Sequence, residues 1–201
     1  MRESNKKPEI VVFAGPNGSG KSTLTKALRP TDMTYINADD IQFALGCDTK
    51  EAAVLAEQRR EDCIAKQQDF CFETVLSTDR NLNLLRKAKE KGYFIRCYFV
   101  LTADPTINIA RVQSRVFAGG HDVPVDKIES RYVKSLANVR EIVEISDVCH
   151  IYDNSTGPYR IFKKRKAECW YCPEKYLWGK ADIVALTGIE NAAKAPLNIK
   201  K

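Results

Sequence analysis

The stretch E-I-V-V-F-A-G-P-N-G-S-G-K-S-T, residues 9–23, decides the fold class of this chain. Its apolar, β-branched first part predicts a strand over 9–14, and the segment from Lys21 to Leu28, which stops before Pro30, predicts a helix. The turn between them matches the pattern GxxxxGK[ST] at all four fixed positions. A strand, a glycine-rich turn and a helix in this order are typical of a P-loop, which binds nucleotide phosphates.

The residue types in this turn suit a phosphate ligand. Glycines let consecutive backbone N–H groups turn inward around a phosphate, and the start of the helix adds positive potential. Lys21 is expected to reach the β- and γ-phosphates, and the Ser22 hydroxyl is expected to bind Mg²⁺. The alternative, a glycine-rich turn that merely precedes a helix, is disfavoured by the complete match. The predicted nucleotide-binding residues are Gly15, Pro16, Asn17, Gly18, Ser19, Gly20, Lys21, Ser22 and Thr23.

Strand and helix signals alternate along the rest of the chain. Strands are predicted over 34–37, 69–72, 93–101 and 148–152, with an edge strand over 159–166; helices are predicted over 51–67, 81–91, 105–116, 126–145 and 181–193. This alternation predicts a three-layer α/β fold. We expect a mostly parallel sheet of five to six strands with helices on both faces.

Composition limits the class of protein. The chain has 201 residues, of which 44% are hydrophobic and 29% charged, and the net charge is +6. These values argue against global disorder and mildly favour anionic ligands, but they do not establish nucleic-acid binding. The seven cysteines are scattered, the N-terminus is polar, and no run approaches the roughly 20 apolar residues of a membrane span. We therefore expect a reduced, cytoplasmic protein with no membrane partner.

The P-loop alone leaves the type of nucleotide chemistry open. A guanine-specific switch would show an N-K-x-D segment near a later strand, but residues 152–155 read Y-D-N-S. A transporter-type ATPase would carry an L-S-G-G-Q segment and a longer chain. Because neither signature is present, a small-molecule kinase is the favoured class.

Polar groups follow three predicted strands, where ligands of open α/β sheets bind. Asp39 and Asp40 follow the second strand, and a carboxylate there could align an acceptor hydroxyl; the alternative is that one of them caps the next helix, and spacing does not decide between these roles. Glu73 and Thr74 end the third strand, where either could bind the acceptor. Glu73 could instead hold Mg²⁺ through water. The alternative is that both lie in a solvated turn. Asp153-Asn154-Ser155 more often forms an Asx-type turn than a ligand site.

Arginines surround a second glycine-rich segment. Arg111 and Arg115 share a helix face, Gly119-Gly120 follows, and Arg131 lies on the next helix. This arrangement predicts a lid over 111–131 that would close guanidinium groups onto the phosphates. The alternative is that these arginines lie on solvated helix faces, which is what we expect of Arg140.

The remaining polar features favour structural roles. His121 is expected to be a lid contact or turn residue, and His150 a hydrogen-bonded core histidine. Cys169 and Cys172 form one C-x-x-C pair, whereas a tetrahedral zinc site needs four ligands. The basic run 163–166 is typical of a solvated edge.

Taken together, these motifs resemble the short bacterial branch of the zeta toxin family of P-loop kinases. The resemblance extends over residues 9–155 and rests on Gly15–Thr23, Asn37–Ile41, Phe72–Ser77, Arg115 to Arg131 with Gly119–Pro124 between them, and Asp153–Ser155. It implies an ATP- and Mg²⁺-dependent kinase acting on a hydroxyl of a UDP-activated N-acetyl amino sugar, such as UDP-N-acetylglucosamine. By the same resemblance, Asp39 is the catalytic carboxylate, Glu73 and Thr74 lie on the acceptor side, and Arg115 and Arg131 meet the ATP phosphates.

The resulting prediction is a single P-loop kinase domain over 1–201, with a core over about 9–155 and an extension over 156–201 of unassigned role. The resemblance also implies an antitoxin-like protein partner. The chain lacks the His-Pro pair that follows the aspartate in plasmid-borne members, since Asp39 precedes Asp40-Ile41. Two alternatives stay open: an ATP-binding, slowly hydrolysing regulatory module that acts through a protein partner, and a nucleic-acid end kinase, for which the net charge of +6 is the only motivation.

Overall fold

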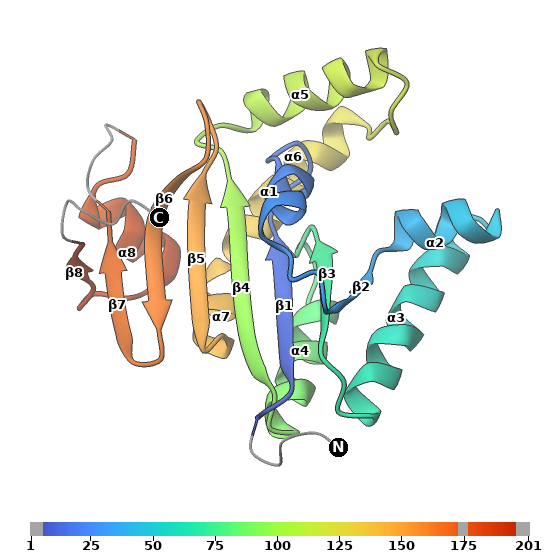
Figure 1. Cartoon of the computed structure of the whole chain (residues 1–201). Helices are drawn as coiled ribbons and strands as arrows, with labels where there is room; N and C mark the ends of the chain where they lie inside the picture. Colours follow the sequence, from blue (N-terminus) through green and yellow to red (C-terminus); the bar gives the residue numbers. More distant parts are fainter. Residues whose placement is uncertain (1–5, 173–176, 196–201) are drawn as a thin grey trace.

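The computed structural model describes residues 6–172 and 177–195, and these residues form one continuous sheet with helices on its two faces (Figure 1). The order of the described strands across the sheet is β2-β3-β1-β4-β5-β6-β7-β8. The strands are β1 (Glu9–Ala14), β2 (Thr34–Ile36), β3 (Phe70–Thr74), β4 (Phe94–Leu101), β5 (Val148–Asp153), β6 (Tyr159–Arg165), β7 (Glu168–Tyr171) and β8 (Ala193–Lys194).

The predicted alternation of strands and helices is confirmed. The helices are α1 (Lys21–Leu28), α2 (Ala38–Leu45), α3 (Thr49–Ala65), α4 (Arg80–Glu90), α5 (Pro105–Phe117), α6 (Val125–Ala137), α7 (Val139–Ile145) and α8 (Lys180–Thr187). Local chemistry sets several of their ends; for example, the Asp104 side chain caps α5 by accepting a hydrogen bond from the Thr106 N–H, and Pro105 follows as its first residue. The predicted helix over 126–145 is instead two helices that meet at Asn138.

The sheet is parallel from β2 to β5 and becomes antiparallel at β6 and β7. The prediction of five to six strands was too low, because β7 and β8 have four and two residues and carry no alternating pattern that would reveal them. Both strands complete the sheet edge beyond β6, the predicted edge strand. The described strands after residue 156 therefore extend the same sheet.

The two faces of the sheet are covered differently. The larger apolar cluster joins one face to α3, α4, α7 and α8, and its fully buried members include Phe72, Phe99 and Leu85. Each such side chain contributes about 1.5–3 kcal/mol when it leaves water. The opposite face carries a smaller cluster around Val11 and Phe13, and α1 packs on β1 and β3. The sheet is thus anchored mainly from one side.

The carboxyl ends of the parallel strands meet at one edge of the molecule. In Figure 1 these ends point towards α5 and α6, which lie beyond the sheet. The P-loop and the loops after β3 and β5 all emerge at this edge. None of the helices in the described residues is both long and apolar enough to cross a membrane.

Candidate active site

The P-loop backbone follows a path that only glycine permits at two positions. A β-carbon on Gly15 would lie 2.0 Å from the carbonyl oxygen of Val100, and one on Gly18 would lie 2.5 Å from that of Asn108. Both residues have positive φ angles, 138° and 76°. Helix α1 begins directly after Gly20 without a side-chain cap. Its first N–H groups therefore stay available for an anion.

Two asparagine side chains hold this loop from outside. The Nδ2 of Asn108, from α5, donates to the carbonyl oxygen of Asn17 at 2.5 Å, and the Nδ2 of Asn154, after β5, donates to that of Ser19 at 2.8 Å. Asn108 is fully buried, and its Oδ1 accepts a hydrogen bond from the Thr102 hydroxyl. No sequence pattern pointed to Asn108, and the Asx-type turn predicted for Asn154 did not indicate a contact to the P-loop.

The ammonium group of Lys21 is held against the P-loop and is influenced by the charges of several other residues. Its Nζ donates to the Pro16 carbonyl oxygen at 3.0 Å. Burial lowers its pKa to about 8; the nearby charges of Glu73 and Asp39 oppose this shift, and the Arg115 charge adds to it. The fold therefore brings the P-loop lysine within electrostatic reach of residues from β3, α2 and α5.

Glu73 reaches the P-loop because β3 lies beside β1. Glu73 pairs in register with Phe13, and its Oε2 accepts a hydrogen bond from the Ser22 hydroxyl at 2.9 Å. A hydroxyl and a carboxylate side by side are the oxygen ligands that Mg²⁺ accepts from a protein when phosphates and water supply the others. The donor set therefore fits a nucleotide-bound Mg²⁺. The alternative of a solvated turn does not describe Glu73, since both of its oxygens have protein partners.

Thr74 is placed differently from Glu73. Its side chain is 8% exposed. Its hydroxyl oxygen accepts hydrogen bonds from the Leu76 N–H at 2.9 Å and the Asn81 Nδ2 at 2.8 Å. These bonds stabilise the turn after β3, so the hydroxyl is engaged within the protein.

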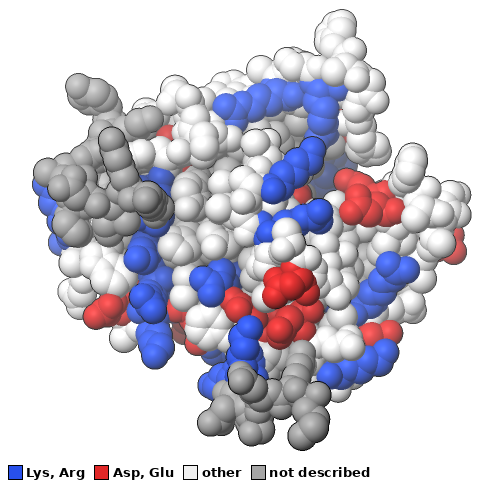
Figure 2. Space-filling view, viewed as in Figure 1, with Lys and Arg blue, Asp and Glu red and all other residues white. Residues whose placement is uncertain are grey.

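Asp39 and Asp40 lie in the first turn of α2, and both are exposed. The N-cap of this helix is Asn37, whose Oδ1 accepts a hydrogen bond from the Asp39 N–H at 2.9 Å. The alternative that one of the two aspartates caps the helix is therefore wrong, because the helix begins one residue earlier than Asp39. Both carboxylates are free of capping. In Figure 2 a red group over the start of α2 faces blue side chains near α1, α5 and α6.

The three arginines of the predicted lid have different partners. Arg111 donates to the carbonyl oxygens of Asn154 and Ser155 at 2.8 and 3.2 Å, so it supports the loop after β5. Arg115 is exposed and donates to the His121 carbonyl oxygen at 2.7 Å. Arg131 donates to the Asn17 Oδ1 at 3.4 Å, next to the P-loop.

The other polar features are structural. Asp153 and Ser155 form the predicted Asx-type turn, with the Ser155 N–H donating to Asp153 Oδ1 at 2.9 Å. His150 is mostly buried in a row with Phe13 and Tyr98, whose ring centroids lie 5.3 Å apart at each step, but its Nδ1 has no hydrogen-bond partner in the described part of the chain. Arg140 is exposed, as expected.

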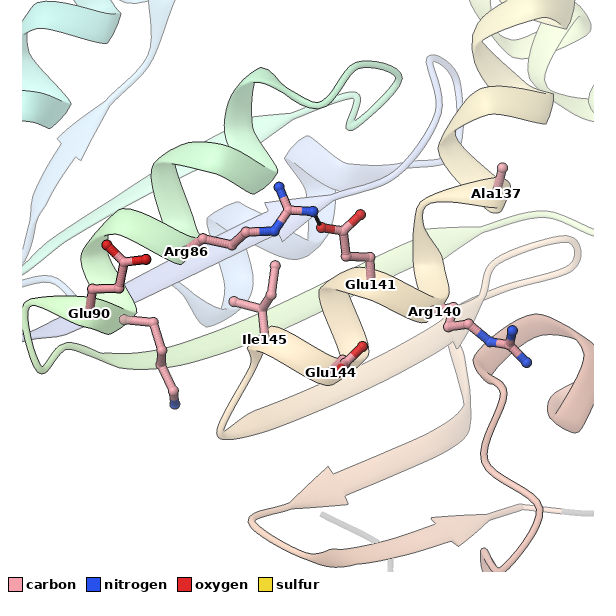
Figure 3. A pocket seen from close by; sticks show the side chains of 8 residues that line it. Arg86, Glu90, Ala137, Arg140, Glu141, Glu144 and Ile145 are labelled. Atoms are coloured by element: carbon pink, nitrogen blue, oxygen red, sulfur yellow. Dashed lines mark ion pairs between the residues drawn. The ribbon is translucent and has the colours of Figure 1, made fainter.

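Within residues 6–172 and 177–195, no three His, Cys, Asp or Glu side chains gather as metal ligands. Cys169 lies on β7 and Cys172 just after it, and the described residues contain no disulfide. A separate pocket of about 720 Å³ lies between α4 and α7, where Arg86 points towards Glu141 and pairs with it (Figure 3). Its lining shares no residue with the P-loop edge, so it is not part of the candidate site.

Comparison with known proteins gives a match to a protein family and to a sequence relative. The model of the Zeta toxin family matches residues 1–166 of this chain. An uncharacterized protein of Haemophilus influenzae is 28% identical over 129 residues, which are 62% of this chain and 92% of that protein.

Two solved structures share the fold. A chain of the PezAT chromosomal toxin–antitoxin system of the human pathogen Streptococcus pneumoniae has a TM-score of 0.55 and 20% identity, with 79% of this chain and 73% of that chain covered. A chain of the AvrRxo1-ORF1:AvrRxo1-ORF2 complex with ATP has a TM-score of 0.68 and 12% identity, with 97% and 66% covered. At these identities the likeness concerns the fold alone.

Proposed function

The chain belongs to the zeta toxin family of P-loop kinases, and from that premise we propose that it transfers the γ-phosphoryl group of ATP to a hydroxyl of a small molecule, with UDP-N-acetylglucosamine or a related UDP-amino sugar as the acceptor. The observation that carries the proposal is the P-loop with Glu73 hydrogen-bonded to Ser22 beside it, where the charges of Glu73, Asp39 and Arg115 all act on Lys21. Phosphoryl transfer depends mainly on positioning and on charge stabilisation, and these residue types supply both.

The proposed ATP site is the P-loop with the start of α1. The backbone N–H groups of the loop would surround the phosphates, and Lys21 would contact the β- and γ-phosphates. Ser22 and Glu73 would hold Mg²⁺ beside them, because their oxygens already lie together. When bound, the metal supplies positive charge at the phosphate oxygens.

Asp39 is the proposed catalytic carboxylate on the acceptor side. Its exposed side chain is free of capping, and its charge acts on Lys21, so it lies near the phosphate end of the site. It would orient the acceptor hydroxyl and accept its proton as the oxygen–phosphorus bond forms and the bond from the γ-phosphorus to the bridging oxygen breaks, releasing ADP. Asp40 and Glu73 are the other proposed acceptor-side residues. Thr74 would act there through the turn after β3, because its hydroxyl accepts hydrogen bonds from Leu76 and Asn81.

Arg115 and Arg131 are the proposed charge-stabilising residues of the lid. Arg131 already contacts Asn17 of the P-loop, which supports a phosphate contact. Arg115 is held by the His121 carbonyl, but its charge acts on Lys21. A change of partner from that carbonyl to a phosphate would bring its guanidinium onto the developing charge.

Two further proposals concern the setting of the reaction. The likeness to a chain of a toxin–antitoxin system supports an antitoxin-like protein partner for this chain. The four buried cysteines, Cys63, Cys71, Cys97 and Cys149, are unoxidised thiols, which supports a reducing compartment such as the cytoplasm.

The test is a search for a phosphorylated product. The protein is incubated with ATP, MgCl₂ and UDP-N-acetylglucosamine, and a sugar nucleotide heavier by one phosphate is expected in the mass spectrum. Asp39→Asn should abolish the product, whereas Asp62→Asn, which removes an exposed carboxylate on α3, should leave it. If no acceptor in a metabolite extract becomes labelled and Asp39→Asn still hydrolyses ATP at the wild-type rate, the kinase proposal fails in favour of a regulatory module.

A further inference from the structure

A chain of hydrogen bonds connects the proposed metal side of the site to the proposed acceptor side. Ser22 Oγ donates to Glu73 Oε2, and Tyr35 Oη donates to Glu73 Oε1, each at 2.9 Å. The Nδ2 of Asn37 donates to Tyr35 Oη at 2.9 Å, and the Asp39 N–H donates to Asn37 Oδ1 at the same distance. The path therefore runs from the P-loop through β3 and β2 to the first turn of α2.

Tyr35 lies in the middle of this series of hydrogen bonds, and its ring is fixed by its neighbours. It packs against the apolar cluster of Val11, Phe13 and Cys71. The guanidinium carbon of Arg29 lies 4.7 Å from the centroid of the ring. Because the ring is fixed, the Tyr35 hydroxyl can link the position of the Glu73 carboxylate to the orientation of the Asn37 side chain.

The direction of each hydrogen bond follows from the donor inventory. An ionised carboxylate only accepts, so the single Tyr35 proton points to Glu73. The Tyr35 oxygen is then left as an acceptor, and it must face the Nδ2 of Asn37 rather than the amide oxygen. That choice turns Asn37 Oδ1 towards the Asp39 N–H. The position of Glu73 thereby sets the orientation of the cap that holds the start of α2.

We propose that Tyr35 is a positioning residue that couples the Glu73 carboxylate to the Asn37 cap, so that binding of Mg²⁺ and nucleotide at Glu73 and Ser22 also orders the Asp39 turn. This inference rests on the proposed function for the roles of Glu73 and Asp39. Because coupling between two sites is reciprocal, ordering of the Asp39 turn also strengthens binding at the Glu73 side. The arrangement ties acceptor-side geometry to a loaded nucleotide site.

The test compares wild-type protein with Tyr35→Phe, which removes only the hydroxyl. Amide hydrogen exchange over residues 37–40 is measured with and without MgCl₂ and a non-hydrolysable ATP analogue. We expect the ligands to slow exchange of the Asp39 amide in the wild type and to slow it about 10-fold less in Tyr35→Phe. We also expect kcat to fall about 10–100-fold, the usual cost of losing an outer-shell partner of a metal ligand, with KM for ATP changed less than about threefold.

Tyr93→Phe is the matched control. The Tyr93 hydroxyl also donates to protein oxygens, the carbonyls of Cys63 and Gln68 at 2.8 and 3.0 Å, but it lies away from the P-loop edge. Its loss should lower the free energy of unfolding and leave the ligand-dependent exchange of Asp39 unchanged. Asn37→Ser is a second variant of the path, because serine can still cap α2 but cannot reach Tyr35.

The exchange readout separates this inference from the proposed function. Equal ligand protection of Asp39 in wild type, Tyr35→Phe and Asn37→Ser, or no protection in the wild type, overturns the coupling. If Tyr35→Phe does not fold, Asn37→Ser alone decides by the same criterion. Protection that is lost in the variants, in a protein that phosphorylates no acceptor, supports the coupling and rejects only the proposed reaction.

Discussion

The amide group of Asn154 donates a hydrogen bond of 2.8 Å to the carbonyl oxygen of Ser19, although the two residues lie 135 positions apart in the sequence. Arg111 of α5 holds the loop after β5, which carries Asn154, by donating to the Asn154 carbonyl oxygen. The P-loop, the end of β5 and helix α5 therefore share one network. A β-carbon on Gly20 would lie 2.3 Å from the Asn154 Nδ2, so the contact is close as well as specific.

Asn154→Ala should weaken ATP binding. The change leaves the Ser19 carbonyl without its partner, and an unsatisfied buried polar group costs about 1–3 kcal/mol. We expect Kd for ATP to rise about 5–100-fold in a fluorescence titration. Asn138→Ala is the matched control, since it also removes an amide-to-carbonyl bond, here to Leu76. Equal affinities for both variants would show that the Asn154 contact does not shape the P-loop.

The affinity for ATP should depend on pH around the pKa of Lys21. Burial lowers this pKa in the folded protein to about 8, from the ordinary lysine value of 10.5. Above pH 8 the free protein therefore loses a proton that bound phosphates would restore. We expect ATP affinity to fall by up to about 10-fold per pH unit above pH 8, with proton uptake measurable by calorimetry in two buffers.

The stability of the free protein should show the opposite trend in the same range. Between pH 8 and 10.5 the unfolded chain holds the Lys21 proton and the folded chain does not, so this group makes unfolding less favourable as pH rises. Lys21→Met should remove both effects. An ATP affinity that stays constant from pH 7 to 9.5 would contradict the lowered pKa.

The two aspartates of α2 should differ in their effect on turnover. Asp39→Asn removes the carboxylate whose charge acts on Lys21, and we expect kcat to fall about 10²–10⁴-fold, the contribution of a positioned acid or base. Asp40→Asn should change kcat less than about fivefold in the same steady-state assay, well below the range for a positioned acid or base, because Asp40 is not among the charges that act on Lys21. A larger loss for Asp40→Asn would reverse the assignment.

Substitution of the two lid arginines, Arg115 and Arg131, should have different effects on kcat and on the Kd for ATP. Arg115→Ala should lower kcat about 10²–10³-fold, the range for losing one charge-stabilising donor. Arg131→Ala should also raise Kd for ATP, because Arg131 contacts the P-loop residue Asn17. Arg140→Ala, on the exposed side of α7, should match the wild type. An unchanged kcat in Arg115→Ala would assign that residue to the lid turn alone.

His150 should make the protein sensitive to acid. Burial, with the charges of Arg160, Lys163 and Arg96, lowers its pKa from 6.5 to about 4. As pH falls from 6.5 to 4, His150 takes up a proton in the unfolded chain but stays neutral in the folded protein. The free energy of unfolding therefore decreases across that window, by about 1–3 kcal/mol. His150→Phe should flatten the pH dependence of the free energy of unfolding in urea. If the variant loses as much stability as the wild type, another group causes the loss.

Local patterns determined a large part of the fold. The P-loop, its flanking strand and helix, and the alternation that gives the parallel sheet were all predictable, because glycine angles, helix caps and periodicity depend on residues a few positions apart. Strands β7 and β8 were not predictable, since four and two residues carry too little pattern. The break at Asn138 was hidden because the apolar spacing continues across it.

For the candidate site, too, some features were predictable from the sequence and others depend on the tertiary structure. The sequence by itself singled out the residues to which the proposed function assigns the chemistry: the loop glycines, Lys21 and Ser22, and the carboxylates that follow the second strand and end the third. Only the tertiary structure decided that Glu73 meets Ser22 and Tyr35, and that Asn154 meets Ser19. These contacts depend on β3 lying beside β1 and on the position of the β5 end. Strand order and register arise from packing of the whole sheet, and a local pattern does not contain them.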